Sequence, residues 1–149
     1  MLDIDCIKDN FANAIISRCS EESCELKLNN LSNYVVLKGE GICTDRRMCD
    51  CIIFTEGICI IIGIVELKGK TAHANEIVEK LANASEIALD ILENCSENLK
   101  YEFYHLVLCK RWRTSEYMVI TNRKIRVRGK RYDIIPKSCG VSFSAVIAW

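Results

Sequence analysis

Two acidic side chains and one basic side chain are spaced along this chain in a way that suits phosphodiester chemistry. Asp50 lies within one apolar segment, and Glu66 and Lys68 follow at the end of a second, residues 58–65. Two carboxylates can bind one Mg²⁺ ion together with a substrate phosphate, and an ammonium group can orient a water or neutralise charge in the transition state. The three residues therefore predict metal-dependent hydrolysis if the fold brings them together.

The two apolar segments have the composition of paired β-strands. The second is too short to span a bilayer, is rich in β-branched side chains and is bounded by glycines, as a buried strand is. Residues 48–54 are predicted to form the preceding strand of a hairpin that pairs Phe54 with Ile60. Asp50 and Glu66 then become diagonal neighbours on one face, with Cβ atoms at most roughly 7–8 Å apart. A register shift by one residue would place them on opposite faces.

Periodicity elsewhere predicts the elements around this hairpin. Apolar residues recur at three- and four-residue steps in residues 3–18 and again in residues 74–95, which predicts two amphipathic helices. Short strands are predicted at residues 34–37 and 101–109. The expected order is helix, three strands, helix, strand.

An acidic residue on one strand, followed by Glu-x-Lys on the next, resembles the signature of the PD-(D/E)xK, or restriction-endonuclease-like, nuclease superfamily. Asp50 matches the first acid, Glu66 the second and Lys68 the lysine, whereas Cys49 stands where the signature has proline. The resemblance covers about residues 3–110. It implies an α/β fold with a restriction-endonuclease-like core, in which helices flank a central mixed β-sheet in the order α-β-β-β-α-β.

The same resemblance implies a site. Asp50, Glu66 and Lys68 would be the catalytic residues, and Asp50, Glu66 and the backbone carbonyl of Leu67 would hold Mg²⁺ or Mn²⁺. The substrate would be DNA or RNA.

Basic residues concentrate at the C-terminal end of the chain. Residues 1–109 carry 18 acidic and 10 basic side chains, whereas residues 110–149 carry 2 acidic and 10 basic, so a net charge of zero divides into −8 and +8. Such a block fits a polyanion-binding face, and a solvated face that balances the acidic remainder fits equally well. The residues expected to bind nucleic acid are Lys110, Arg111, Arg113, Lys124, Arg126 and Arg128.

The basic region also predicts extra C-terminal strands. Alternation along residues 124–127 puts Lys124, Arg126 and Arg128 on one face, opposite the two apolar residues of that segment. The segments predicted as strands are residues 117–121 and 124–127, with residues 132–135 and 141–148 as candidate edge strands.

Ten cysteines are scattered along the chain without a CxxC pair. The favoured interpretation is that they are small core side chains, with Cys49 and Cys51 turned away from the Asp50 face. One or two disulfides rank second, because the absence of Gln, the single Pro and the abundant Ile are compatible with a hyperthermophile, where intracellular disulfides occur. A zinc or iron–sulfur site ranks last.

Length and composition limit the domain organisation. At 149 residues, 50% of them hydrophobic, the chain is long enough for one sizeable core and too short for two ordinary domains. It shows neither a signal-peptide pattern nor an apolar stretch that could cross a membrane. We therefore expect a single cytoplasmic domain, residues 1–149, with a core at about 3–110, a basic extension at about 111–149 and no membrane contact. A homodimer is an open alternative.

Other side chains could contribute to a site, and each has a structural alternative. Glu22 or Glu40 could supply an additional acid, although a solvated loop charge is the favoured interpretation. His73 could contact phosphate, and Trp112 could stack on a base or fill a packing gap. His105, within an apolar strand, is expected to be a satisfied interior residue.

The function predicted from these patterns is a divalent-metal-dependent phosphodiesterase acting on DNA or RNA. The first alternative is a nucleic-acid-binding or assembly module that keeps the fold without the catalysis. The second is a protein–protein adaptor, in which the charge asymmetry serves docking.

Overall fold

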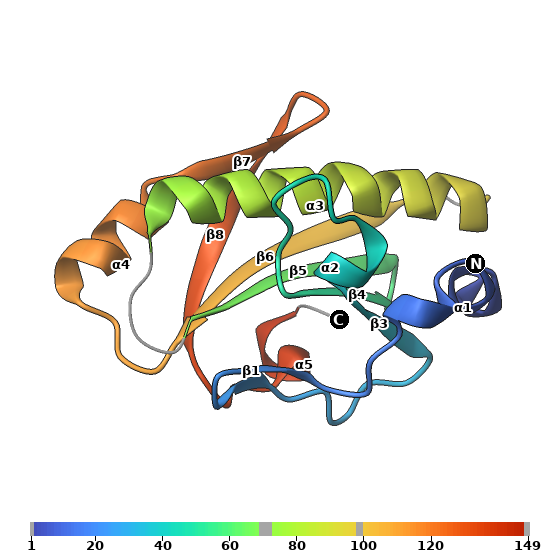
Figure 1. Ribbon diagram of the computed structural model, residues 1–149, viewed down its shortest axis with the longest axis horizontal. Helices are drawn as coiled ribbons and strands as arrows, with labels where there is room; N and C mark the ends of the chain where they lie inside the picture. The colour runs from blue at the N-terminus through green and yellow to red at the C-terminus, as the bar shows by residue number, and fades with distance from the viewer. Residues whose placement is uncertain (1, 69–72, 98–99, 148–149) are drawn as a thin grey trace.

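A six-stranded mixed β-sheet forms the centre of the molecule (Figure 1). The computed structural model of the chain describes residues 2–68, 73–97 and 100–147. The sheet has the strand order β3-β4-β5-β6-β8-β7; β3, β4 and β5 are antiparallel, β6 lies parallel to β5 and β8, and β7 is antiparallel to β8. The strands are β3 (Tyr34–Lys38), β4 (Cys51–Glu56), β5 (Ile60–Lys68), β6 (Tyr101–Cys109), β7 (Lys124–Val127) and β8 (Lys130–Ser138).

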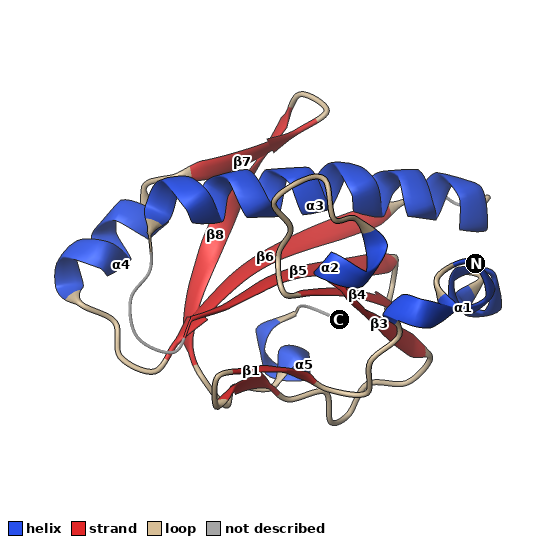
Figure 2. Ribbon diagram, in the orientation of Figure 1, coloured by secondary structure: helices blue, strands red, loops and turns tan. Residues whose placement is uncertain are grey.

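The sheet is covered by different elements on its two faces (Figure 2). Helix α3 (Ala74–Cys95) crosses one face, and α1 (Ile4–Asn10) lies near its C-terminal end. A small hairpin, β1 (Cys19–Glu21) and β2 (Cys24–Leu26), covers the other face together with α5 (Phe143–Val146). The remaining elements are the 3₁₀ helix η1 (Ala12–Ala14) and the helices α2 (Gly39–Ile42) and α4 (Thr114–Thr121).

Helix α3 lies on the sheet because its apolar residues follow helical spacing. Ile77, Leu81, Ala84 and Ala88 are fully buried against the even-numbered residues of β4 and β5. Neither α3 nor any other helix in the described parts of the chain has the length and apolar composition needed to cross a membrane.

The second layer packs closely because β5 contains a glycine. A Cβ added at Gly63 would lie 2.7 Å from Cζ of Phe143, so only glycine leaves room for this ring of α5. Phe143 is fully buried in the apolar cluster that the small hairpin also enters.

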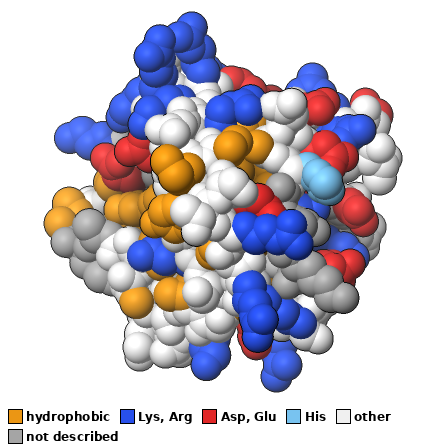
Figure 3. Space-filling view, turned by 90° about the vertical axis from the view of Figure 1, so that its left-hand side faces the viewer, with side chains coloured by type: hydrophobic (Ala, Val, Ile, Leu, Met, Phe, Trp, Pro, Cys, Tyr) orange, Lys and Arg blue, Asp and Glu red, His pale blue; other side chains and the backbone are white. Residues whose placement is uncertain are grey.

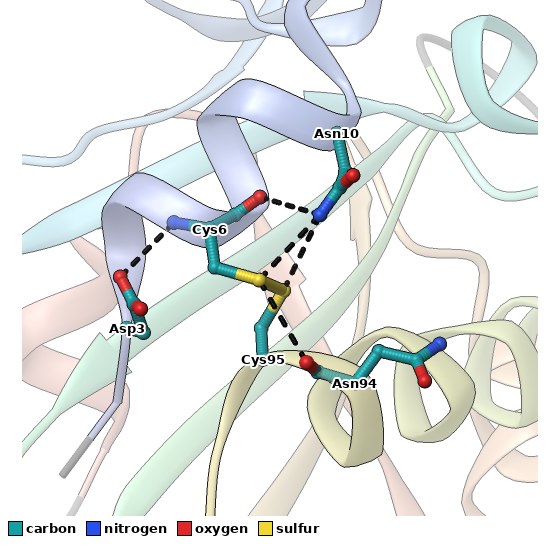
Figure 4. Close-up of a disulfide and its surroundings, with 5 residues drawn as sticks. All are labelled: Asp3, Cys6, Asn10, Asn94 and Cys95. Carbon is teal, nitrogen blue, oxygen red and sulfur yellow. Dashed lines mark hydrogen bonds between the residues drawn. A yellow bond between two sulfur atoms is a disulfide. The ribbon is translucent and has the colours of Figure 1, made fainter.

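Three disulfides join segments that are far apart in the sequence. Figure 4 shows one of them, Cys6–Cys95, which ties α1 to the last residue of α3 beside the side chain of Asn10 and the backbone carbonyl of Asn94. The interpretation of the cysteines as small core side chains is therefore wrong for six of the ten, because folding brings these pairs within bonding distance. The other two disulfides are Cys19–Cys51 and Cys24–Cys139, and the free cysteines are Cys43, Cys49, Cys59 and Cys109.

The predicted order of helix, three strands, helix, strand agrees with α1, β3, β4, β5, α3 and β6, but the first helix ends at Asn10 and not at residue 18. The small β1–β2 hairpin within this order was not predicted. Residues 117–121 belong to helix α4, so the strand prediction there is wrong; a short apolar run fits either structure by periodicity alone. The edge strand proposed at 141–148 is also wrong, since α5 forms there, whereas the predicted strand at 124–127 is confirmed.

Candidate active site

The β4–β5 hairpin places Glu66 on the face that α3 covers and brings Asp50, the residue before β4, close to it. Phe54 pairs with Ile62, two residues further along β5 than the sequence predicted. A shift of two residues keeps every side chain on its face, because side chains alternate with period two. The N–H of Asp50 donates to the carbonyl of Val65 at 3.0 Å, and Val65 is also the ladder partner of Cys51. Asp50 therefore lies just before the ladder, beside Val65 and Glu66.

The register differs from the prediction because β4 extends to Glu56, two residues beyond the predicted end, although it begins only at Cys51. Thr55 and Glu56 pair with Ile61 and Ile60 as part of the ladder, which leaves only residues 57–59 in the loop. The shorter loop advances the pairing by two positions and brings the two acids closer together.

Glu66 is the most enclosed polar group of the site. Its side chain is fully buried, and its Oε2 accepts hydrogen bonds from the Nζ of Lys80 at 2.9 Å and forms an ion pair with the Nζ of Lys68 at 3.1 Å. Its Oε1 is buried and has no hydrogen-bond partner among the described residues. A buried polar atom without a hydrogen-bond partner destabilises the fold. Oε1 is therefore suited to bind a cation or a hydrogen-bond donor.

Asp50 is held by the backbone of the next strand. Its Oδ2 accepts a hydrogen bond of 2.6 Å from the N–H of Leu67. Burial, and then the neighbouring Glu66 carboxylate, raise the pKa of Asp50 to about 7, although the bond from Leu67 acts in the opposite direction. The two acids thus oppose full ionisation near neutral pH, and a cation shared between them would remove this opposition.

Lys80 is a member of the site that the sequence analysis missed. Burial alone would lower its pKa, but the hydrogen bond to Glu66 and the charges of Glu66 and Asp50 raise it above its ordinary value. Its position in the sequence could have indicated this role. Lys80 lies three residues after Ile77 and four before Ala84, at helical spacing from the apolar residues that α3 buries. A lysine at the edge of such a stripe must bring its charge to a partner near the core.

Cys49 and Cys51 do not both turn away from Asp50. Cys51 faces the second layer and is bonded to Cys19, as strand alternation predicts. Cys49 precedes β4, so the alternation does not extend to it, and it is buried in the cluster beneath α3. Burial and the nearby Glu66 carboxylate raise the pKa of its thiol far above the ordinary value, so Cys49 is a neutral wall of the site rather than a nucleophile.

The other candidates lie in less suggestive surroundings. Glu22 and Glu40 are exposed. His105 is buried and shares a hydrogen bond of 2.7 Å with the hydroxyl of Ser85, as expected for an interior residue, except that its Nδ1 has no partner among the described residues. Trp112 is half-buried and donates its Nε1–H to the carbonyl of Lys137. This agrees with the expectation that it fills a packing gap rather than stacks on a base.

The basic residues predicted to bind nucleic acid fall into two groups. Lys110, Arg111 and Arg126 are exposed. Arg113 and Lys124 are also exposed and form ion pairs, Arg113 with Glu116 at 3.7 Å and Lys124 with Asp133. The face assigned to Arg128 is wrong, because this residue lies in the turn after β7. Figure 3 shows lysine and arginine side chains spread over the end of the molecule where α4 lies, and gathered at its top.

No group of three or more His, Cys, Asp or Glu side chains in the described residues is arranged to hold a metal. Asp50 and Glu66 supply two carboxylates, one with an unpartnered buried oxygen. This set fits Mg²⁺, which binds through one or two carboxylates and takes its other ligands from water and substrate phosphate. The predicted third ligand, the carbonyl of Leu67, stays a prediction.

Comparisons of the chain with protein-family models, curated proteins and solved structures found no match. The resemblance to the PD-(D/E)xK superfamily thus depends on Asp50, Glu66, Lys68 and the order of the elements around them.

Proposed function

We propose that this chain is a divalent-metal-dependent nuclease with a restriction-endonuclease-like core, acting on DNA or RNA. The observation that carries the proposal is the meeting of three side chains at the end of β5. Asp50 accepts a hydrogen bond of 2.6 Å from the N–H of Leu67, and the ammonium group of Lys68 lies 3.1 Å from the carboxylate of Glu66. The order and pairing of β3, β4, β5 and β6 support it, because the same order of strands was expected from the resemblance.

Each residue of the site has a role that follows from its surroundings. Asp50 and Glu66 would hold Mg²⁺ or Mn²⁺, which when bound would polarise a phosphoryl oxygen and lower the pKa of a water. Lys80 keeps Oε2 of Glu66 occupied, so that Oε1 would be the oxygen free to bind the cation. Lys68, less enclosed than Glu66, orients the attacking water or neutralises charge on the phosphate.

One observation favours a second candidate function. Glu66 already has two ammonium groups on one oxygen, and such an ion cluster is also what a structural role would require. A non-catalytic nucleic-acid-binding or assembly module would keep this cluster and the basic C-terminal region without hydrolysing its ligand.

Cleavage assays on labelled single- and double-stranded DNA and RNA, with Mg²⁺, Mn²⁺ or EDTA, separate the two. The wild type should cut at least one substrate only when metal is present. The Glu66→Gln variant should lose about 100-fold or more in rate, because a neutral amide is a poor metal ligand and leaves the lysines unpaired. The exposed Glu79→Gln variant is the matched control and should cut normally.

Two results would count against the nuclease. Undiminished cleavage by Glu66→Gln would place the activity elsewhere, and binding without metal-dependent cleavage of any of the four substrates would support the module. Thermal unfolding of both variants is needed, because a buried carboxylate is also part of the core.

A further inference from the structure

The β7–β8 hairpin presents a charged face that points away from α3. Ile125 and Val127 are buried toward α3, so Lys124 and Arg126 project from the opposite face of β7. In the ladder, Lys124 lies opposite Asp133, and Arg126 lies opposite Arg131. The outward residues of these two ladder positions are therefore all charged, without an apolar side chain among them.

The hairpin is fixed to α3 by its turn. Arg128 and Gly129 both have positive φ, 48° and 83°, as a tight two-residue turn requires. The guanidinium of Arg128 reaches back to three carboxylates of α3: Asp90 at 3.1 Å, Glu86 at 3.6 Å and Glu93. Arg128 therefore anchors the hairpin, which projects past α3 in Figure 1, and is not available to an external anion.

Arg126 and Arg131 are a like-charged pair without compensation. Side chains directly opposite on an antiparallel ladder have Cβ atoms about 5 Å apart, and like charges there are destabilising. The neighbouring Lys124 forms an ion pair with Asp133. Within the described ranges, neither Arg126 nor Arg131 has a carboxylate partner, and both are exposed. A shared anion would turn this repulsion into attraction.

We propose that Arg126 and Arg131 form a phosphate-binding pair that grips the backbone of a nucleic acid, as an anchor separate from Asp50 and Glu66. Guanidinium groups bind phosphate oxygens through paired N–H donors. The face is an open strand surface, so it cannot enclose a small anion, and without apolar residues it lacks the anchors of a protein interface. A repeating phosphodiester is the ligand that gains from such a surface. The identification as nucleic acid rests on the proposed function.

The test is binding without catalysis. Fluorescence anisotropy in EDTA would measure the affinity for labelled duplex DNA of two unrelated sequences over a range of NaCl concentrations. Arg131→Glu is the informative variant, because its carboxylate would pair with Arg126 across the ladder and keep the hairpin folded. Lys8→Glu, at an exposed position of α1, makes the same change in net charge and is the control.

Arg131→Glu should weaken binding about tenfold at low salt, equally for both sequences, and should flatten the salt slope by about 1.8, or 0.9 for each of two lost contacts. Its melting temperature should not fall. Unchanged affinity and slope, an equal loss in Lys8→Glu, or a loss confined to one sequence would each overturn the proposal. So would wild-type binding to phosphatidylserine vesicles but not to DNA.

These outcomes are independent of the nuclease assay. If the wild type cleaves no substrate but Arg131→Glu weakens DNA binding, the phosphate-binding pair is supported and the catalytic site is not. If the wild type cleaves but Arg131→Glu binds DNA with unchanged affinity, the catalytic site is supported and the phosphate-binding pair is not.

Discussion

At the residue scale, burial and then the carboxylate of Glu66 both oppose ionisation of Asp50. The folded chain thus holds a proton, with the Asp50 pKa at about 7, that the unfolded chain releases at its ordinary pKa of 3.8. A group whose pKa is raised by folding contributes stability that is fully present below its unfolded pKa and is lost as the pH rises through the folded value. The relevant window is therefore pH 3.8 to 7.

We predict that Asp50→Asn, which cannot ionise, changes the pH dependence of stability. Between pH 4 and 7 in EDTA, the free energy of unfolding of the wild type should fall relative to the variant, by at most about 1.4 kcal/mol per pH unit. Urea unfolding at each pH measures this difference. Parallel profiles for the two proteins would show that Asp50 is not opposed by Glu66.

Mg²⁺ should reverse the difference in stability between the wild type and Asp50→Asn. At pH 8 a cation shared by the two carboxylates should raise the free energy of unfolding of the wild type with the logarithm of its concentration, and that of Asp50→Asn much less. Stabilisation of both proteins to the same extent would place the ion elsewhere.

At the scale of elements, the parts that could be predicted are those that depend on local periodicity. Glu66 could be assigned to the face of Ile62 and Ile64 because an error of two residues in register does not change the face. Asp50 precedes β4, and alternation did not predict the hydrogen bond that it accepts from the N–H of Leu67. Lys80 could not be assigned, because its contact with Glu66 depends on how α3 lies across the sheet. Helix α4, residues 114–121, was not predicted either. Only Ile120 of its apolar run is buried, so the run does not show the periodicity of a helix packed on a core.

The contact between β5 and α5 offers a test of packing between elements. Gly63→Ala would place a methyl group 2.7 Å from the ring of Phe143, which must then move. We expect a loss of about 1–3 kcal/mol in the free energy of unfolding, as for other overpacked cores. In Phe143→Leu, with a smaller side chain, the same Gly63→Ala change should cost less. A double-mutant cycle by urea unfolding measures this coupling, and additive effects would contradict a direct contact.

At the scale of the whole molecule, the charge asymmetry is partly internal. Arg128 of the basic region contacts Glu86, Asp90 and Glu93 of the acidic region, so part of the division into −8 and +8 holds the C-terminal hairpin against α3. The sequence could reveal the asymmetry but not this pairing, because Arg128 leaves the strand face only through the positive φ of its turn.

The disulfides likewise act on the whole chain. Ten cysteines allow many pairings, and only the fold selects Cys6–Cys95, Cys19–Cys51 and Cys24–Cys139. Disulfides persist in oxidising compartments or in intracellular proteins of hyperthermophiles. The expected cytoplasmic location is compatible with them only in the second case.

The Cys24–Cys139 bond connects β2 to the segment before α5, across 115 residues of sequence. Because a cross-link that closes a long loop restricts the unfolded chain, replacing both cysteines by alanine should lower the free energy of unfolding by about 2–5 kcal/mol. Nucleic-acid binding by the basic hairpin should be unchanged at temperatures where the variant stays folded, since neither cysteine lies in that hairpin. Urea unfolding and anisotropy measure the two effects. The free Cys43→Ala and Cys59→Ala changes are the controls, and an equal loss of stability in them would contradict a specific role for the bond.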